Sequence, residues 1–187
     1  PDETNNIASR HRDRVEQWSQ ETADWRIAVH RTHQQSSRAV VDKYVSDSGQ
    51  SPDQPMNAVF GGLVELRGFS LPKRKVRGNG RLKIHYFFHV LKPVPPRYRL
   101  RLRGTAFGQN RVFEHVPVRG LYPLRDWQPG EYIEDVHSFK IRDSWGAERL
   151  ALCIELVDEH ERPLPVTGDQ GNTCVPLASI EVLPAKK

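Results

Sequence analysis

Four arginines alternate along one stretch of the chain, and their spacing predicts a basic face that binds anions. They are Arg97, Arg99, Arg101 and Arg103. Alternate residues of a β-strand point to the same side, roughly 6.7 Å apart, and guanidinium groups bind phosphate or carboxylate through two parallel hydrogen bonds. An upstream cluster extends the predicted patch: Lys73, Arg74 and Lys75. Two interpretations stay open, namely docking on an anionic surface or a solvated face balanced by acids such as Glu65, Glu155 or Asp158.

Large amphipathic rings surround a predicted turn. Pro129-Gly130 is typical of a turn in which Gly takes a positive φ, and Tyr122, Trp127 and Tyr132 lie close to it in the sequence. Such rings form stacking platforms for sugars, with neighbouring carboxylates accepting hydroxyl protons. The alternative is that Trp127 folds back and closes the end of the domain.

The histidines and cysteines do not indicate a catalytic or metal centre. The eight histidines are scattered, and His85 and His89 would be ~13 Å apart in a strand, too far to share a metal. No Ser-His-Asp arrangement follows from the spacing, so we expect no enzyme activity, no cofactor and no metal. Cys153 and Cys174 allow either a disulfide in an oxidising compartment or two buried thiols, and the thiols are the simpler interpretation.

Beyond residue 56 the apolar pattern has a period of two, which is typical of β-strands. Leu82, Ile84, Tyr86, Phe88 and Val90 alternate with polar or second-face residues. We expect strands near 57–69, 81–91, 97–107, 111–117, 131–141, 148–158 and 173–183. Short strands separated by regular turns predict a mainly β fold, an antiparallel two-sheet sandwich of Ig-like or jelly-roll-like type over 57–187.

The first 48 residues predict one long amphipathic helix, a docking arm or stalk. Apolar residues at alternating spacings of three and four form a seam, and its contact residues are Val15, Trp18, Trp25 and Val29. This helix packs on its own domain or on a partner, and both interpretations stay open beside a third, partial disorder of the segment. A Pro- and Gly-containing segment, 49–56, is expected to be a linker.

Composition limits the class of partner. The chain carries a net charge of +5 and is 37% hydrophobic, so anionic partners are favoured. Nucleic acid is not favoured, because the basic face lacks interleaved exposed aromatics and a known motif. No apolar run reaches the ~18 residues of a membrane span, and since Pro1 is not Met, we expect a processed product or a fragment that an anchor can precede.

A series of motifs spans roughly residues 57–166 and begins at Phe60-Gly61-Gly62. It continues through His115-Val116-Pro117, Tyr122-Pro123, Trp127-Gln128-Pro129-Gly130-Glu131 and Asp135, and closes at Arg162-Pro163-Leu164-Pro165. In these motifs the second part of the chain resembles the extracytoplasmic β-sandwich at the C-terminal end of some bacterial membrane glycosyltransferases. Trp145-Gly146-Ala147-Glu148 replaces the usual entry to the late strand. The resemblance implies an accessory, non-catalytic module and carries over no ligand-binding residue.

These patterns predict a structural or docking subunit. We expect it to associate with a membrane protein complex or an anionic membrane surface through the helix and the basic sheet face. The alternative is a carbohydrate-binding accessory module of a membrane glycosyltransferase system, with a glycan as partner. We expect a membrane-associated protein on the periplasmic side, with the cytoplasmic side left open.

Overall fold

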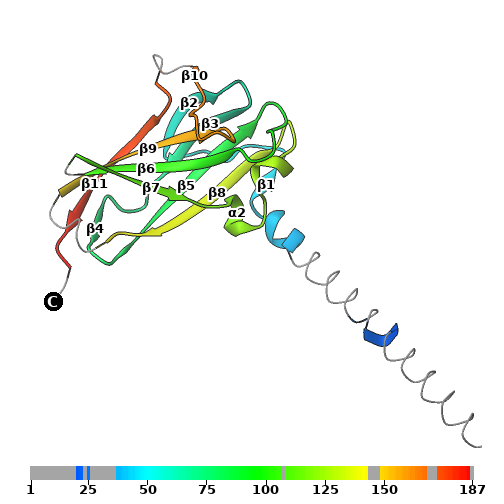
Figure 1. Cartoon of the computed structure of the whole chain (residues 1–187), viewed down its shortest axis with the longest axis horizontal. Coiled ribbons are helices and arrows are strands. Elements are labelled where there is room, and N and C mark those ends of the chain that lie inside the picture. The colour runs from blue at the N-terminus through cyan, green and yellow to red at the C-terminus, as the bar shows by residue number, and fades with distance from the viewer. Residues whose placement is uncertain are drawn as a thin grey trace, which may run out of the picture. The chain divides into compact units, whose positions relative to one another are not determined.

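A computed structural model describes residues 20–22, 25, 37–106, 108–142, 148–167 and 172–185. The chain forms two compact units, Pro1–Val40 and Val41–Lys187. The second unit is mainly β and holds every strand in Figure 1. Its strands form two sheets, so the predicted mainly β fold is confirmed.

The first sheet has six strands in the order β1-β8-β5-β3-β2-β10, all antiparallel to their neighbours. Its strands are β1 (Val45–Ser46), β2 (Gln54–Phe60), β3 (Val64–Ser70), β5 (Arg81–Val90), β8 (Tyr132–Lys140) and β10 (Val166–Thr167). The β5–β8 pair is its longest ladder and runs without a register shift from Arg81–Lys140 to His89–Tyr132. This uninterrupted ladder fixes the register of β8 against β5.

The second sheet has five strands in the order β4-β11-β9-β6-β7. Its strands are β4 (Lys75–Arg77), β6 (Arg99–Ala106), β7 (Gln109–Glu114), β9 (Glu148–Val157) and β11 (Val175–Leu183). The short strand β4 pairs with β11 in parallel. The prediction of purely antiparallel sheets was therefore wrong at this edge, where a strand too short to show a period of two joins the sheet.

One apolar core lies between the sheets and follows from the alternation in the sequence. Leu82, Ile84, Tyr86 and Phe88 of β5 are each 1% exposed or less, and Leu100 and Leu102 of β6 belong to the same buried cluster. The short helices α2 (Pro117–Gly120) and η1 (Leu124–Asp126) follow β7. Figure 1 shows α2 beside β1 at one end of this body, and there Val118, Leu124 and Trp127 add to the core.

The predicted strand 57–69 is two strands joined by a tight turn. Gly61 and Gly62 have φ of 54° and 69°, and the N–H of Leu63 donates to the carbonyl of Phe60. Only Gly adopts two successive positive φ values at little cost. The Gly-Gly pair inside an apolar run was therefore the signal for a hairpin.

The predicted helix 1–48 ends earlier than expected. Residues 20–22, 25 and 37–41 are helical, and most of the predicted helix lies outside the described residues. Beyond Val41 the chain turns, and Val45 pairs with Ile133 while Tyr44 packs on the core. The predicted linker 49–56 also runs into β2, which begins at Gln54. The apolar residues near position 45 therefore belong to the sheet.

The second sheet carries a disulfide between Cys153 and Cys174, with their Cα atoms 5.6 Å apart. Cys153 lies on β9, and Cys174 directly precedes β11. Antiparallel pairing sets Cys153 opposite Pro176, which brings the two thiols together. Two buried thiols, the simpler interpretation of the sequence, are therefore not what the structure contains.

The predicted turn at Pro129-Gly130 is present. Gly130 has a φ of 92°, and its N–H donates to the carbonyl of Val90. The carboxylate of Glu131 accepts the N–H of Gln128 at 2.8 Å, and it also accepts the hydroxyl of Tyr122. This turn fixes the start of β8.

Candidate anion-binding site

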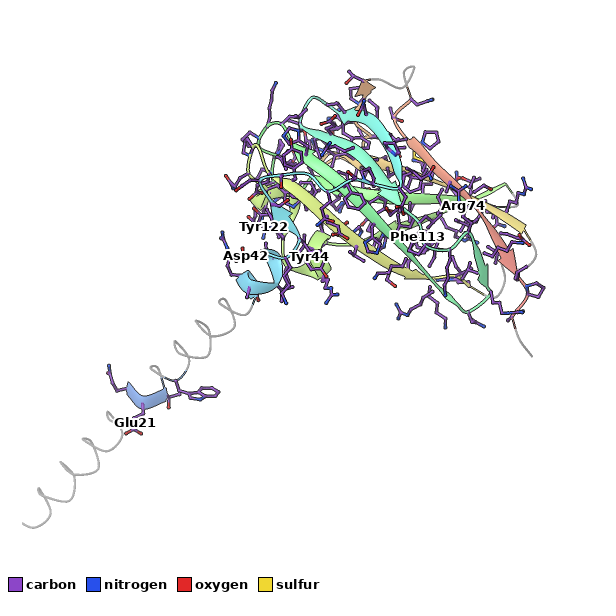
Figure 2. All side chains as sticks on the ribbon, turned by 180° about the vertical axis from the view of Figure 1, so that it is seen from behind. Glu21, Asp42, Tyr44, Arg74, Phe113 and Tyr122 are labelled. Carbon is purple, nitrogen blue, oxygen red and sulfur yellow. A yellow bond between two sulfur atoms is a disulfide. The ribbon has the colours of Figure 1, made fainter. Side chains whose placement is uncertain are left out.

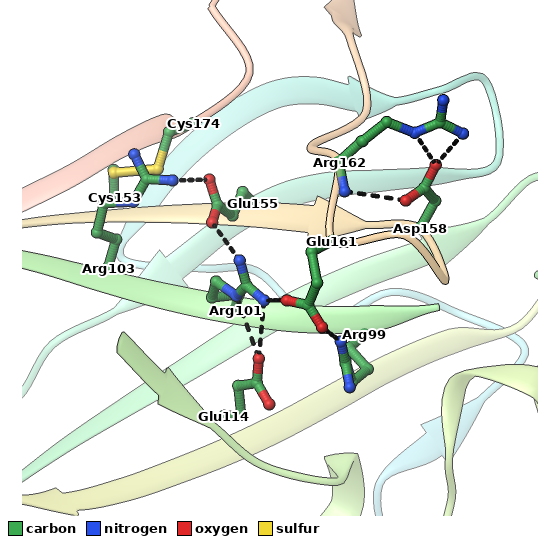
Figure 3. Close-up of polar contacts among 10 residues, drawn as sticks. All are labelled: Arg99, Arg101, Arg103, Glu114, Cys153, Glu155, Asp158, Glu161, Arg162 and Cys174. Carbon is green, nitrogen blue, oxygen red and sulfur yellow. Dashed lines mark hydrogen bonds and ion pairs between the residues drawn. A yellow bond between two sulfur atoms is a disulfide. The ribbon is translucent and has the colours of Figure 1, made fainter. Parts of the chain in front are cut away.

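The predicted arginine row lies on the outer face of β6. Leu100, Leu102 and Gly104 point into the core, so Arg99, Arg101 and Arg103 share the opposite face. Figure 3 shows carboxylates set between them. The row is therefore an ion-pair ladder, and its charge is largely balanced inside the domain.

Glu155 of β9 is the centre of this ladder. Its side chain is fully buried; its carboxylate lies 2.6 Å from Nη2 of Arg103 and 3.7 Å from Nη1 of Arg101. Arg101 also pairs with Glu114 at 3.1 Å. Glu161 pairs with both Arg99 and Arg101. A buried carboxylate is costly unless it is paired, so the row agrees with the balanced-face interpretation at Glu155. The other two acids named there pair elsewhere, Glu65 with His89 and Asp158 with Arg162.

The remaining predicted cations lie apart from the row. Arg97 precedes β6 in a turn with a φ of 69°, so it is not on the strand face. Lys73 and Arg74 are exposed in the β3–β4 connection, and Figure 2 places Arg74 far from Tyr44 along the domain. Lys75 pairs with Glu181 at 2.8 Å. The predicted basic residues thus do not form one continuous patch.

The three predicted sugar-stacking rings make contacts within the domain, and Tyr122 donates its hydroxyl to the carboxylate of Glu131 at 2.9 Å. Trp127 is 1% exposed, packs on Phe88 with ring centroids 5.4 Å apart, and donates its indole N–H to the carbonyl of Tyr122. It closes the end of the domain, as the alternative interpretation held. Tyr132 stacks on His89 at 4.4 Å, and Arg67 lies 5.2 Å from its centroid. Trp127 is therefore buried, and Tyr132 is stacked on His89.

A different basic surface lies at the edge of the second sheet. An open depression of ≈ 550 Å³ is lined by Arg111, Val112, Phe113, Lys140 and Arg142. The first three belong to β7, and the two others to the end of β8 and the residues after it. We call Arg111, Lys140 and Arg142 the basic edge.

The basic edge has no acidic partner within the part of the chain that the structure describes. Among the described residues no carboxylate pairs with any of its three cations, and Arg111 instead donates to the amide oxygen of Gln109 at 2.6 Å. Lys140 stands opposite Arg81 in the β5–β8 ladder, which adds a fourth positive charge nearby. Val112 of the same strand is 51% exposed and alternates with Arg111, so it lies on the other face of β7. Cations without a described acidic partner beside an exposed apolar residue favour an anionic partner with some apolar character.

Aromatic rings beneath the basic edge hold it in place. Phe113 of β7 packs on Phe139 of β8 with centroids 4.3 Å apart. His137 continues this row, 5.2 Å from Phe139 and stacked 3.8 Å from His115. These rings pack β7 of the second sheet against β8 of the first sheet, and the basic edge lies on the same two strands.

Next to these rings lies a buried polar cluster centred on Asp135. Asp135 is fully buried, accepts the N–H of Val118 at 2.9 Å and bonds to Nε2 of His115. The pKa of His137 is lowered to about 3, chiefly by burial and also by the nearby His115, while Asp135 opposes the shift. Burial raises the pKa of Tyr86 well above its ordinary value, and Asp135 acts in the same direction. The cluster orients α2, where Val118 and Arg119 have φ of 52° and 59°.

Only part of the predicted helix contact can be described. Val15, Trp18 and Val29 lie outside the described residues. Trp25 is helical and 66% exposed. The predicted contact face stays a prediction.

The comparisons with known proteins give no family. No known family model and no curated protein matches the chain. Within the part of the chain that the structure describes, no group of three or more His, Cys, Asp or Glu side chains is arranged to hold a metal ion. No helix among those residues is long and apolar enough to cross a membrane.

The sequence alone did not single out the basic edge. Arg111 is separated from Lys140 and Arg142 by about thirty positions, and strand order alone brings them together. A signal was nevertheless present, because β7 carries a basic residue beside an exposed valine. Such charged, short strands are typical of sheet edges.

Proposed function

We propose that this chain is a non-catalytic docking subunit that attaches to a membrane protein complex or an anionic membrane surface through the basic edge. The observation that carries the proposal is the convergence of Arg111, Lys140 and Arg142 on one depression without an acidic partner among the described residues. The N-terminal segment is a second contact element in this proposal, supported by the exposed Trp25.

The location in this proposal is the extracytoplasmic side of a membrane. The Cys153–Cys174 disulfide supports it, because disulfides persist in oxidising compartments. The resemblance of residues 57–166 to accessory modules of membrane glycosyltransferases points the same way. The proposal also takes the two sheets to be an Ig-like or jelly-roll-like sandwich preceded by a long helical arm.

The second candidate, a carbohydrate-binding accessory module, has weaker support. Trp127 is buried, and Tyr132 is covered by His89 and Arg67. The hollow beside Tyr132, lined also by Tyr44 and Glu134, has room for about one water at ≈ 10 Å³. A sugar ring would have to displace these side chains.

Vesicle binding tests the proposal. The triple variant R111Q/K140Q/R142Q removes three cations that lie near the partner, each worth about 1 kcal/mol at an anionic membrane. We expect its affinity for phosphatidylglycerol vesicles to fall on the order of 100-fold, with little binding of any form to neutral phosphatidylcholine.

A matched control variant removes the same charge elsewhere. The control uses three exposed cations away from the basic edge, Lys43, Lys92 and Arg97. Lys43 precedes β1, which pairs with the start of β8, Lys92 follows the end of β5, and Arg97 precedes β6. The variant K43Q/K92Q/R97Q should keep most of the affinity. Equal losses in the two triple variants would show that net charge, and not the basic edge, governs binding.

A further inference from the structure

The strand β7 is an open edge of the second sheet. It pairs with β6 on one side and is the last strand of the sheet order over the described residues. Four of its first five residues and its last are exposed, and Val112 presents half of its surface to solvent. Unpaired edges are templates for another strand.

The register shows which backbone groups face outward. Ala106 pairs with Gln109 across a two-residue connection, and such closing pairs exchange hydrogen bonds. Hydrogen-bonded pairs recur at every second residue, so Arg111 and Phe113 bond to β6. The N–H and C=O groups of Asn110, Val112 and Glu114 then point away from the sheet. In agreement, the guanidinium of Arg111 reaches the carbonyl of Asn110 at 3.5 Å.

The charge around this edge selects the strand that is added. Side chains of an incoming strand on one face would meet Arg111, Lys140 and Arg142, which favours acidic residues there. On the other face its side chains would lie beside Val112, which favours apolar, β-branched residues. Two copies of this chain do not fit edge to edge, since two basic edges repel each other.

We propose that β7 accepts an extended acidic segment of a protein partner as an additional strand. This inference rests on the proposed function and names the partner of the basic edge. The added strand has alternating acidic and β-branched residues and spans about six residues, roughly 20 Å. Backbone hydrogen bonds to Asn110, Val112 and Glu114 give affinity, and the basic edge gives specificity.

A peptide-binding experiment tests the inference on the full chain. The probe is a fluorescein-labelled peptide, Gly-Ser-Glu-Val-Glu-Val-Glu-Val-Gly-Ser, measured by fluorescence anisotropy. The variant V112P removes one outward N–H and leaves the ladder to β6 intact, because proline is tolerated where an edge N–H faces solvent. The control V112T keeps that N–H. We expect V112P to weaken peptide binding tenfold or more, V112T to change it less than twofold, and neither to alter binding to anionic vesicles.

A second measurement uses the wild-type protein alone, so it decides the question even where V112P does not fold. Two peptides carry N-methyl groups on all Val or on all Glu residues. An added strand uses one of its two edges, so we expect only one of these peptides to lose binding.

The opposite outcomes separate the two proposals. Equal binding of V112P, V112T and both N-methyl peptides would show recognition by charge alone and overturn strand addition. Binding to vesicles without binding to the peptide would make a lipid surface the partner and overturn it as well. Full binding of peptide and vesicles by R111Q/K140Q/R142Q would overturn the proposed function itself.

Discussion

Replacing Arg101 with glutamine should destabilise the domain without weakening its binding to anionic surfaces. The Arg101 side chain is 13% exposed and contacts three carboxylates, those of Glu114, Glu155 and Glu161. Breaking a buried pair costs ~3–5 kcal/mol when a charge is left alone. Glu155 keeps its contact with Arg103, so we expect a loss of about 2 kcal/mol of unfolding free energy for R101Q.

Equilibrium urea unfolding of the full chain measures this loss. For a unit of the size of Val41–Lys187, about 2 kcal/mol corresponds to a fall of roughly 4–8 °C in Tm. The matched control is R99Q, because Arg99 and Glu161 are 42% and 55% exposed, and exposed pairs contribute less than about 1 kcal/mol. A double-mutant cycle with E155Q should give a coupling free energy of at least ~0.5 kcal/mol.

The same variants are then tested on phosphatidylglycerol vesicles. We expect R101Q to bind as the wild type does, since its guanidinium is occupied by carboxylates. A variant with unchanged stability and weakened vesicle binding would refute the reasoning. It would restore the arginine row of β6 as the docking surface.

Three further predictions follow from other parts of the domain. Replacing Cys153 and Cys174 with serine should cost about 3 kcal/mol, because the disulfide closes a 21-residue separation; urea midpoints with and without reductant should differ for the wild type and coincide for the variant. Gly130→Val should lower the free energy of unfolding by ~1–3 kcal/mol and Gly130→Asn by less, because the φ of 92° strains a β-branched residue more than Asn, while a Cβ there meets no atom within 4 Å. Equal Tm values for both variants and the wild type would contradict this turn geometry. The pKa of His137 is about 3 in the folded protein and ordinarily 6.5. Between these pH values the unfolded chain binds one more proton at this histidine, so the free energy of unfolding falls as the pH is lowered from 6.5 toward 3. In urea titrations His137→Phe should flatten this pH dependence, whereas the control His160→Gln, at an exposed site, should retain it.

The strand pattern could be predicted because alternation is local. Apolar residues recur at every second position from Leu82 to Val90, and β5 covers this range. The turn at Gly130 followed from two residues whose backbone preferences are strong. The turn at Gly61-Gly62 was missed because an apolar run on both sides resembled one long strand.

The charge balance of the arginine row could not be predicted, because it depends on register. Arg101 stands opposite Glu155 on one neighbouring strand and opposite Glu114 on the other. No residue near position 101 in the sequence indicates either of these cross-strand partners. The disulfide is similar, since the register of β9 with β11 decides whether Cys153 and Cys174 meet.

The basic edge depends on strand order, which is a still less local property. Arg111 is prominent only because β7 ends its sheet, and Lys140 and Arg142 join it only because the end of β8 lies beside that edge. In sequence the three cations look like scattered surface residues. The row of four arginines looked more like a site, although Glu114, Glu155 and Glu161 neutralise most of it.

Hydrogen exchange of the full chain with and without phosphatidylglycerol vesicles tests the central claim most directly, because it maps the contact on the unmodified protein. We predict slower exchange at residues 109–114 and 140–142 on binding, and no change at 99–103. Protection of 99–103, or of the loop at 72–75, with no effect at 109–114 would contradict the assignment of the basic edge as the docking surface.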